Sequence, residues 1–163
     1  FSAGMVSVLL LVYGVAIAVG NVIGGKMADR DPVRALTTLF LAQALVLLAF
    51  TFTAPHPVLA VITLFLMGAL AFANVPGLQV YVVQLAQRFT PGGVDVASAL
   101  NIAAFNLGIA AGAFIGGLVV SSALGLAATP WIGALFVAGG LLLTLLSARL
   151  DRHAPAPAPQ AAD

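Results

Sequence analysis

The chain has 163 residues and a formal net charge of +1, and 62% of its residues are hydrophobic while only 7% are charged. A soluble domain carries about a quarter charged residues, so this composition excludes a water-soluble globular protein and predicts a membrane protein. The small net charge argues against nucleic acid as a partner, and the absence of cysteine excludes disulfides and thiol chemistry.

Five apolar stretches are each long enough to cross about 30 Å of hydrocarbon as helices. They comprise residues 3–23, 35–53, 58–83, 96–124 and 131–148. Strands of a membrane barrel would instead be about ten residues long and would alternate with polar positions. The sequence therefore predicts an all-α, polytopic transmembrane bundle of about five spans, with a membrane domain over residues 1–150. Because the chain begins with Phe1 rather than methionine, we also expect a fragment.

The first span carries small residues four apart, at Ala16, Gly20 and Gly24. Such a stripe lets two helix backbones approach closely in lipid, where packing drives association. We expect a helix interface on this face. Surfaces that slide during transport would carry the same pattern, so the stripe names no function by itself.

The connection after the first span reads GGKMADRDPVR and places five charges beside a double glycine. The glycines let one helix end close to its neighbour, and Asp29 can accept hydrogen bonds from helix N-terminal amides or pair with a basic side chain. Two interpretations stay open at this point. The connection is either a clamp that opens and closes, or an ordinary charged hairpin that follows the positive-inside rule.

The third span contains NVPG at residues 74–77 inside an apolar run. The proline removes an amide donor, which predicts a kink or a break in the helix. Irregular backbone at membrane depth lines cavities in many transporters, whereas a simple packing kink is the alternative. Tyr81 lies seven residues after Asn74 and shares its face of the helix. The predicted substrate-cavity residues of this span are Asn74, Pro76, Gly77, Gln79 and Tyr81.

The fourth span carries a second stripe of small residues four apart, beginning at Ala104. At about 100° per residue, Asn101 falls on the glycine face, whereas Asn106 points roughly 140° away from it. We expect Asn101 to hydrogen-bond across a packed interface and Asn106 to line a cavity, because polar groups in a membrane seldom face lipid. The predicted packing residues of the two stripes are Gly20, Gly24, Asn101, Gly108, Gly112 and Gly116.

All Lys and Arg residues fall in the odd-numbered connections or after the last span. They are Lys26, Arg30, Arg34, Arg88, Arg149 and Arg152. Because Lys and Arg mark the cytoplasmic side, we expect a multi-pass protein of the plasma (inner) membrane with its C-terminus in the cytoplasm. Residues 151–163, in which Pro155, Pro157 and Pro159 alternate with alanine, are predicted to form a disordered cytoplasmic tail.

A catalytic centre is not expected, because the five spans contain no Asp, Glu, His or Cys. His56 and His153 lie in a short outer loop and in the tail, so a shared metal site would need unusual geometry. The sequence therefore predicts neither an enzyme nor a bound metal or cofactor.

The first connection resembles the signature loop of the major facilitator superfamily, whose usual form is Gly-x-x-Ala/Gly-Asp-Arg-x-Gly-Arg-Lys/Arg. The matching residues are Gly25, Ala28, Asp29, Arg30 and Arg34. Pro32 and Val33 depart from the pattern, as in the weaker copy in that family's C-terminal half. The fourth span, NIAAFNLGIAAGAFIGGLVV, also looks like the eleventh helix of bacterial efflux permeases of the arabinose and multidrug type.

The resemblance covers the whole chain and implies that its spans are helices eight to twelve of a twelve-helix fold. It implies secondary active, proton-coupled efflux of sugars, drugs or other small molecules by rocking of two halves around a central site. Asp29 and Arg30 would take part in a cytoplasmic clamp, and the first and fourth spans would pack against the opposite half. The implied partners are membrane lipid, the missing N-terminal half, a small-molecule substrate and protons. A proton carrier would come from that half, since the spans carry no carboxylate.

A non-transporting membrane scaffold or assembly protein is the alternative function. In such a protein the glycine stripes would be static interfaces, and the charged connection would only set topology. A hydrophobic cavity with a few amides would suit many small molecules, so the sequence does not choose a substrate.

Overall fold

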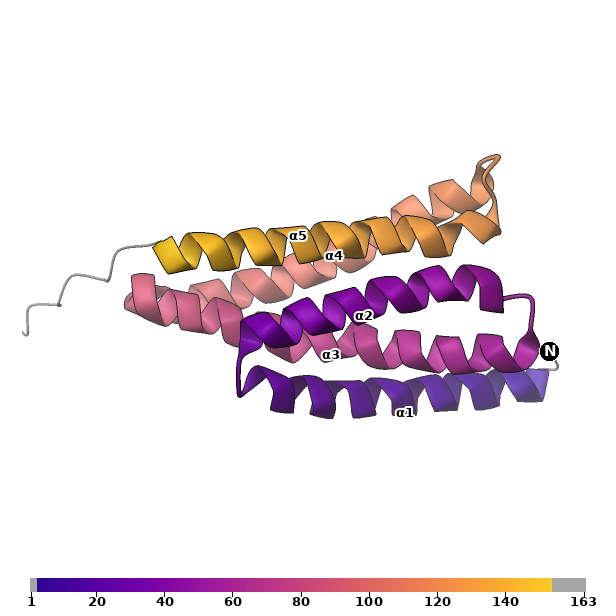
Figure 1. The fold of residues 1–163 in the computed structure, drawn as a ribbon, viewed down its shortest axis with the longest axis horizontal. Helices are drawn as coiled ribbons and strands as arrows, with labels where there is room; N and C mark the ends of the chain where they lie inside the picture. Colours follow the sequence, from indigo (N-terminus) through magenta and orange to yellow (C-terminus); the bar gives the residue numbers. More distant parts are fainter. Residues whose placement is uncertain (1–2, 154–163) are drawn as a thin grey trace, which may run out of the picture.

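The computed structural model describes residues 3–153, which form five long α-helices and no strand (Figure 1). The helices are α1 (Ala3–Ala28), α2 (Pro32–Thr53), α3 (Pro57–Phe89), α4 (Val94–Ser121) and α5 (Thr129–His153). Two 3-10 turns, η1 (Pro91–Gly93) and η2 (Leu126–Ala128), precede α4 and α5. All five helices are long and apolar enough to cross a membrane, so the predicted all-α polytopic fold is confirmed.

Helix α5 extends further than the sequence indicated. It continues to His153, so the prediction of a disordered tail from residue 151 is wrong for residues 151–153. Basic side chains in a last helical turn interact favourably with its free carbonyls, and His153 Nδ1 lies 2.7 Å from the carbonyl oxygen of Arg149. The rest of the predicted tail, with its alternating prolines, lies outside the described residues.

Helix α3 passes through Pro76 without interruption, so of the predicted kink or break the break is absent. The two halves of the helix do point in different directions in Figure 1. A transmembrane helix tolerates such a proline when neighbouring groups and small local adjustments compensate the lost hydrogen bond. Because α3 bends but stays continuous, its polar residues keep regular helical spacing.

Helix α3 is the centre of the bundle. It packs against α1 and α2, and α5 packs mainly against α2, whereas α4 makes fewer contacts with α3 and fewest with α5. The buried core is made mostly of small residues with a few leucines, including Ala16, Leu36, Leu39 and Ala73. No residue of α4, all of which is described, is buried. Most large apolar side chains therefore face outward, as expected when lipid is the solvent.

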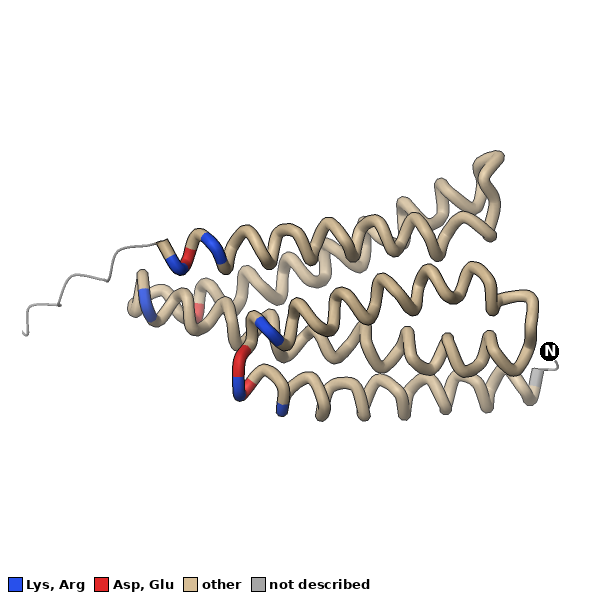
Figure 2. Tube along the Cα trace, viewed as in Figure 1, with Lys and Arg blue, Asp and Glu red and all other residues tan. Residues whose placement is uncertain are grey.

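Every charged residue that the structure describes lies at one end of the bundle (Figure 2). This charged end comprises the α1–α2 connection, the α3–α4 connection and the end of α5. The α2–α3 and α4–α5 connections form the opposite, uncharged end. The separation is the one that the positive-inside rule requires of a five-span chain, and the assignment of the charged end to the cytoplasm stays a prediction.

Candidate functional site

A hollow of about 500 Å³ that is open to the surface, named the inner cavity for its place between four helices, is lined by residues of α2, α3, α4 and α5. Its walls are largely apolar and include Phe40, Phe105 and Phe136, which come from three different helices. Gln43 of α2 and Asn74 of α3 are the amides that line it, and both lie in the central part of their helices. The cavity thus combines aromatic walls with a few polar groups, as small-molecule sites commonly do.

The two amides of the inner cavity have unpaired oxygens. Gln43 is 7% exposed and Asn74 is 5% exposed, and neither Gln43 Oε1 nor Asn74 Oδ1 accepts a hydrogen bond from the described residues. The amide nitrogen of Asn74 donates to the carbonyl of Leu70 at 2.9 Å, which fixes the direction of its oxygen. A buried acceptor left without a donor costs about 1–3 kcal/mol. Gln43 and Asn74 therefore carry, beside the cavity, two buried acceptors that no donor of the described residues satisfies.

A second hollow, the α3–α4 groove, has a volume of about 540 Å³. Gln79, Asn101 and Asn106 line it. It shares Val75, Leu78 and Phe105 with the inner cavity. The hollows therefore lie on two sides of the same apolar side chains. Of the amides predicted from the sequence, the structure brings Gln79, Asn101 and Asn106 together in this groove. It places Asn74 in the adjoining inner cavity.

Hydrogen bonds join α3 to α4 beside this groove. Asn101 Nδ2 donates to Gln79 Oε1 at 2.7 Å, and Gln79 Nε2 donates to the hydroxyl of Ser98. Asn106 is exposed and donates its amide hydrogen to the carbonyl of Ile102 in its own helix, at 3.0 Å. Asn101 therefore links two helices, while the oxygen of Asn106 stays available in the groove.

Tyr81 and Gly77 lie in helix contacts and line neither hollow. The buried Tyr81 hydroxyl is 3.1 Å from Ser147 Oγ of α5. A Cβ on Gly77 would lie 3.0 Å from Leu36 Cδ2 of α2, so this glycine lets the two helices meet. Tyr81 shares a face with Asn74 but sits about 10 Å further along α3, where its neighbour is a different helix. The residues predicted as one ligand site are thus divided among the inner cavity, the α3–α4 groove and the contacts between helices.

Gln43 is the cavity residue that sequence reasoning missed. It is the one amide in the apolar span 35–53, and no motif surrounds it. A lone polar side chain at membrane depth is itself a signal, because such groups usually face the interior of the bundle.

The charged connection contains a helix cap at Asp31. Its Oδ1 accepts a hydrogen bond from the amide of Arg34 at 3.0 Å, and its Oδ2 lies 3.1 Å from Arg34 Nε. The sequence suggested Asp29 for this role, and that suggestion is wrong. Asp29 and Arg30 form an exposed turn, and neither side chain has a hydrogen bond or ion pair within the described range.

The two glycine stripes have different surroundings. On α1, a Cβ at Gly20 would lie 1.9 Å from the carbonyl oxygen of Ala69, so this stripe packs on α3 within the chain. The resemblance implied that the first span packs against the opposite half, and for this face of α1 that expectation is wrong. On α4, a Cβ at Gly108, Gly112 or Gly116 would meet nothing within 4 Å among the described residues. These three glycines border an open groove of about 470 Å³ between α4 and α5.

Comparison with known proteins gives a consistent result. The family model described as the Major Facilitator Superfamily matches residues 1–163. The "Uncharacterized MFS-type transporter YtbD" of Bacillus subtilis is 56% identical over 153 residues, which cover 94% of this chain and 38% of that protein. The "Inner membrane transport protein YdhP" of Escherichia coli is 40% identical over 144 residues, which cover 88% of this chain and 36% of that protein.

A further relative, the "Uncharacterized MFS-type transporter YfhI" of Bacillus subtilis, is 33% identical over 147 residues, covering 88% of this chain and 35% of that protein. The chain therefore spans well under half the length of these curated relatives. No solved structure was found to match it.

Proposed function

The chain belongs to the major facilitator superfamily, and from this premise we propose that it is part of a secondary active transporter that exports small molecules in exchange for protons. In this proposal the chain supplies helices eight to twelve, and the remaining helices complete the substrate path. Carboxylates of the described residues lie only at the charged end of the bundle. The proton carrier at membrane depth is therefore assigned to the rest of the protein.

The inner cavity is the observation that carries the proposal. Gln43 and Asn74 line an aromatic cavity in the middle of their helices, and their side-chain oxygens are buried acceptors without donors among the described residues. Because both atoms are acceptors, the group that they bind is a hydrogen-bond donor, such as a hydroxyl, amide or amine on a largely apolar molecule. Asn106 and Gln79 extend this polar lining into the adjoining α3–α4 groove.

The clamp role of the charged connection is also part of the proposal. Asp29 and Arg30 are exposed, and within the described residues neither side chain makes a hydrogen bond or ion pair that would hold it in place. They are therefore free to pair with charged groups on the opposite half when the transporter closes toward the charged end. Alternating access requires such contacts to form in one state and to break in the other.

Transport by the full-length protein tests the assignment of the cavity. We expect Gln43→Leu and Asn74→Leu each to lower efflux of a hydroxyl- or amine-bearing substrate about tenfold in proteoliposomes, because each removes one hydrogen bond to it. Gln84→Leu is the matched control, since this amide lies on α3, is exposed and lines neither hollow. Full efflux in both cavity variants would remove these amides from the substrate path.

A separate measurement tests transport itself. Cells that lack the gene are expected to accumulate the exported compound, and collapse of the proton gradient is expected to have the same effect in cells that carry it. If accumulation of every compound in a broad panel is unchanged on deletion, the scaffold alternative replaces the transporter.

A further inference from the structure

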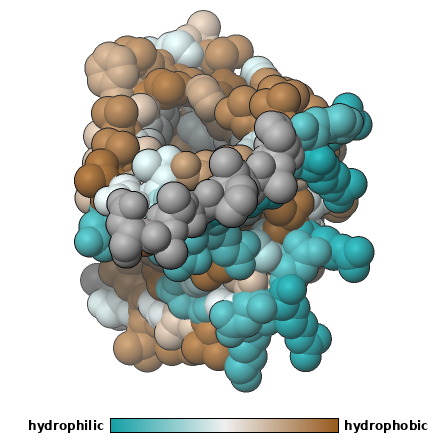
Figure 3. Space-filling view, turned by 90° about the vertical axis from the view of Figure 1, so that its left-hand side faces the viewer, coloured by the Kyte–Doolittle hydropathy of each residue, from teal (hydrophilic) through white to brown (hydrophobic). Residues whose placement is uncertain are grey.

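A basic hollow, the arginine groove, lies at the charged end between the start of α2 and the end of α5. Its volume is about 340 Å³, and Arg34, Arg149 and Arg152 line it together with the hydroxyl-bearing Thr37 and Thr38. Three arginines from two helices thus line one hollow beside the apolar part of the bundle. Figure 3 shows that hydrophilic side chains gather at this end of the molecule.

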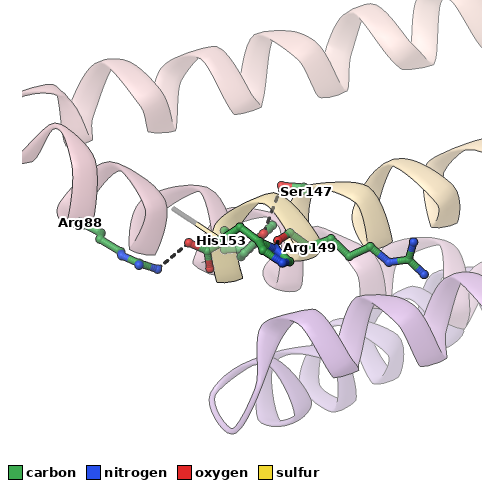
Figure 4. Close-up of polar contacts among 6 residues, drawn as sticks. Arg88, Ser147, Arg149 and His153 are labelled. Carbon is green, nitrogen blue, oxygen red and sulfur yellow. Dashed lines mark hydrogen bonds and ion pairs between the residues drawn. The ribbon is translucent and has the colours of Figure 1, made fainter. Parts of the chain in front are cut away.

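Two acidic residues at this end of the bundle are already paired. Asp31 forms an ion pair with Arg34, one of the three arginines of the groove, and also caps α2. Asp151 forms an ion pair with Arg88 of α3. In Figure 4 the side chain of Arg149 extends away from that pair. Within the described residues, Arg149 and Arg152 have no acidic partner, and the groove keeps a positive charge.

Apolar surface continues from the groove toward the middle of the membrane. Leu41 and Leu45 follow Thr37 by one and two helical turns, and they are 51% and 58% exposed. On α5, Leu142 lies about one turn before Leu145, which lines the groove, and it is 68% exposed. The surface is therefore cationic and hydroxyl-bearing at its end and apolar along its length.

We propose that the arginine groove binds the phosphate group of an anionic phospholipid, whose acyl chains lie along the exposed leucines of α2 and α5. Guanidinium groups match phosphate oxygens in geometry and charge, and basic hollows between transmembrane helices suit anionic headgroups. A free phosphate ion would use the arginines alone. The continuous apolar surface below them is what selects a lipid as the occupant.

Lipid retention by the full-length protein tests the proposal. The protein is purified in mild detergent and titrated with phosphatidylglycerol or with zwitterionic phosphatidylcholine, and bound lipid is counted by native mass spectrometry. We expect tighter binding of phosphatidylglycerol, and we expect Arg149→Gln with Arg152→Gln to weaken it about tenfold or more, since each cation near an anionic headgroup contributes to the attraction. Lys26→Gln with Arg30→Gln removes the same charge from the same end, outside the groove, and is expected to change binding less than twofold.

A phosphate competition and a charge-conserving variant distinguish a bound lipid from a free anion. Millimolar inorganic phosphate is expected to leave the bound lipid in place, and displacement would instead assign the groove to a free anion. Arg149→Lys with Arg152→Lys keeps the charge and is expected to retain most of the binding. Equal binding of the two lipids by the unaltered protein would overturn the proposal, as would equal losses in the groove variant and in the Lys26 and Arg30 control.

Discussion

The backbone of Gly24 in α1 lies so close to Ala73 in α3 that a Cβ on the glycine would sit 2.0 Å from the Ala73 carbonyl oxygen. One turn earlier the same relationship joins Gly20 to Ala69, at 1.9 Å. The obstacle at each position is backbone and cannot rotate away. Close contact between α1 and α3 therefore depends on the absence of a side chain at these two glycines.

The first prediction concerns Gly24 and its neighbour. Gly24→Ala is expected to destabilise the protein by about 1–3 kcal/mol, because the new methyl group forces the two helices apart. Gly25→Ala is the matched control, since a Cβ there meets nothing within 4 Å in the described part of the chain. It is expected to be neutral or to stabilise α1 by up to about 1 kcal/mol through helix propensity. Thermal unfolding in detergent, followed by circular dichroism, measures both; equal melting temperatures would contradict the close approach.

The glycine stripes show how far sequence spacing predicts packing. Ala16, Gly20 and Gly24 predicted a close helix contact, and α1 makes one with α3. The stripe from Gly108 to Gly116 has the same spacing, but a Cβ at any of its glycines would meet nothing within 4 Å among the described residues. Small residues four apart indicate that another helix can approach this helix backbone closely. Which helix approaches depends on the whole arrangement of the bundle, which the spacing within one helix does not specify.

At the candidate site, too, the sequence predicts the helices and the faces of their polar residues but not which helices meet there. Apolar length alone was enough to predict five helices, because about 20 residues are needed to cross the bilayer. Helical periodicity correctly related Asn74 to Tyr81 on one face, but it carried no information about the helices that pack there. Gln43 comes from another helix and joins Asn74 only through tertiary packing. Likewise, local turn geometry, which composition does not specify, gave the cap to Asp31 rather than Asp29.

The second prediction concerns the amide link between α3 and α4. In a double-mutant cycle, Gln79→Ala and Asn101→Ala are expected to show a coupling of about 0.6 kcal/mol, and at most about 1.7, as is typical of hydrogen bonds between helices in membranes. Asn106→Ala is the control, because its amide bonds to its own helix. A coupling of zero between Gln79 and Asn101 would show that the link is absent in the membrane.

The third prediction concerns the hydroxyl pair of Tyr81 and Ser147. Tyr81→Phe removes the hydroxyl that lies 3.1 Å from Ser147 Oγ, and it is expected to cost about 0.5–1.5 kcal/mol of stability. Because Tyr81 lines neither hollow, the substrate profile in an efflux assay is expected to stay unchanged. In the Ser147→Ala background the further loss is expected to be smaller. A changed substrate profile with unchanged stability would instead return Tyr81 to the substrate path.

The fourth prediction concerns the ion pair between Arg88 and Asp151, which ties the end of α3 to the end of α5 (Figure 4). The side chains are 38% and 26% exposed, so water and salt screen the pair, and its loss is expected to cost only about 0.5 kcal/mol. Asp151→Arg places like charges together and is expected to lower the melting temperature, whereas adding Arg88→Asp restores it. The difference is expected to shrink at 1 M salt, where screening acts over about 3 Å. No rescue by the exchanged pair would mean that the two side chains do not meet.

The fifth prediction concerns orientation. The chain contains no cysteine, so a single introduced thiol reports its own position without interference from this part of the protein. Arg30→Cys at the charged end is expected to react with a membrane-impermeant maleimide only after the cell is opened, and His56→Cys at the uncharged end is expected to react in intact cells. Both positions are exposed, so access to the reagent depends on the side of the membrane and not on burial. The reverse pattern would place the charged end outside. It would then move the clamp, the arginine groove and the leaflet that supplies its lipid to the opposite face, because all three lie at the same end of the bundle.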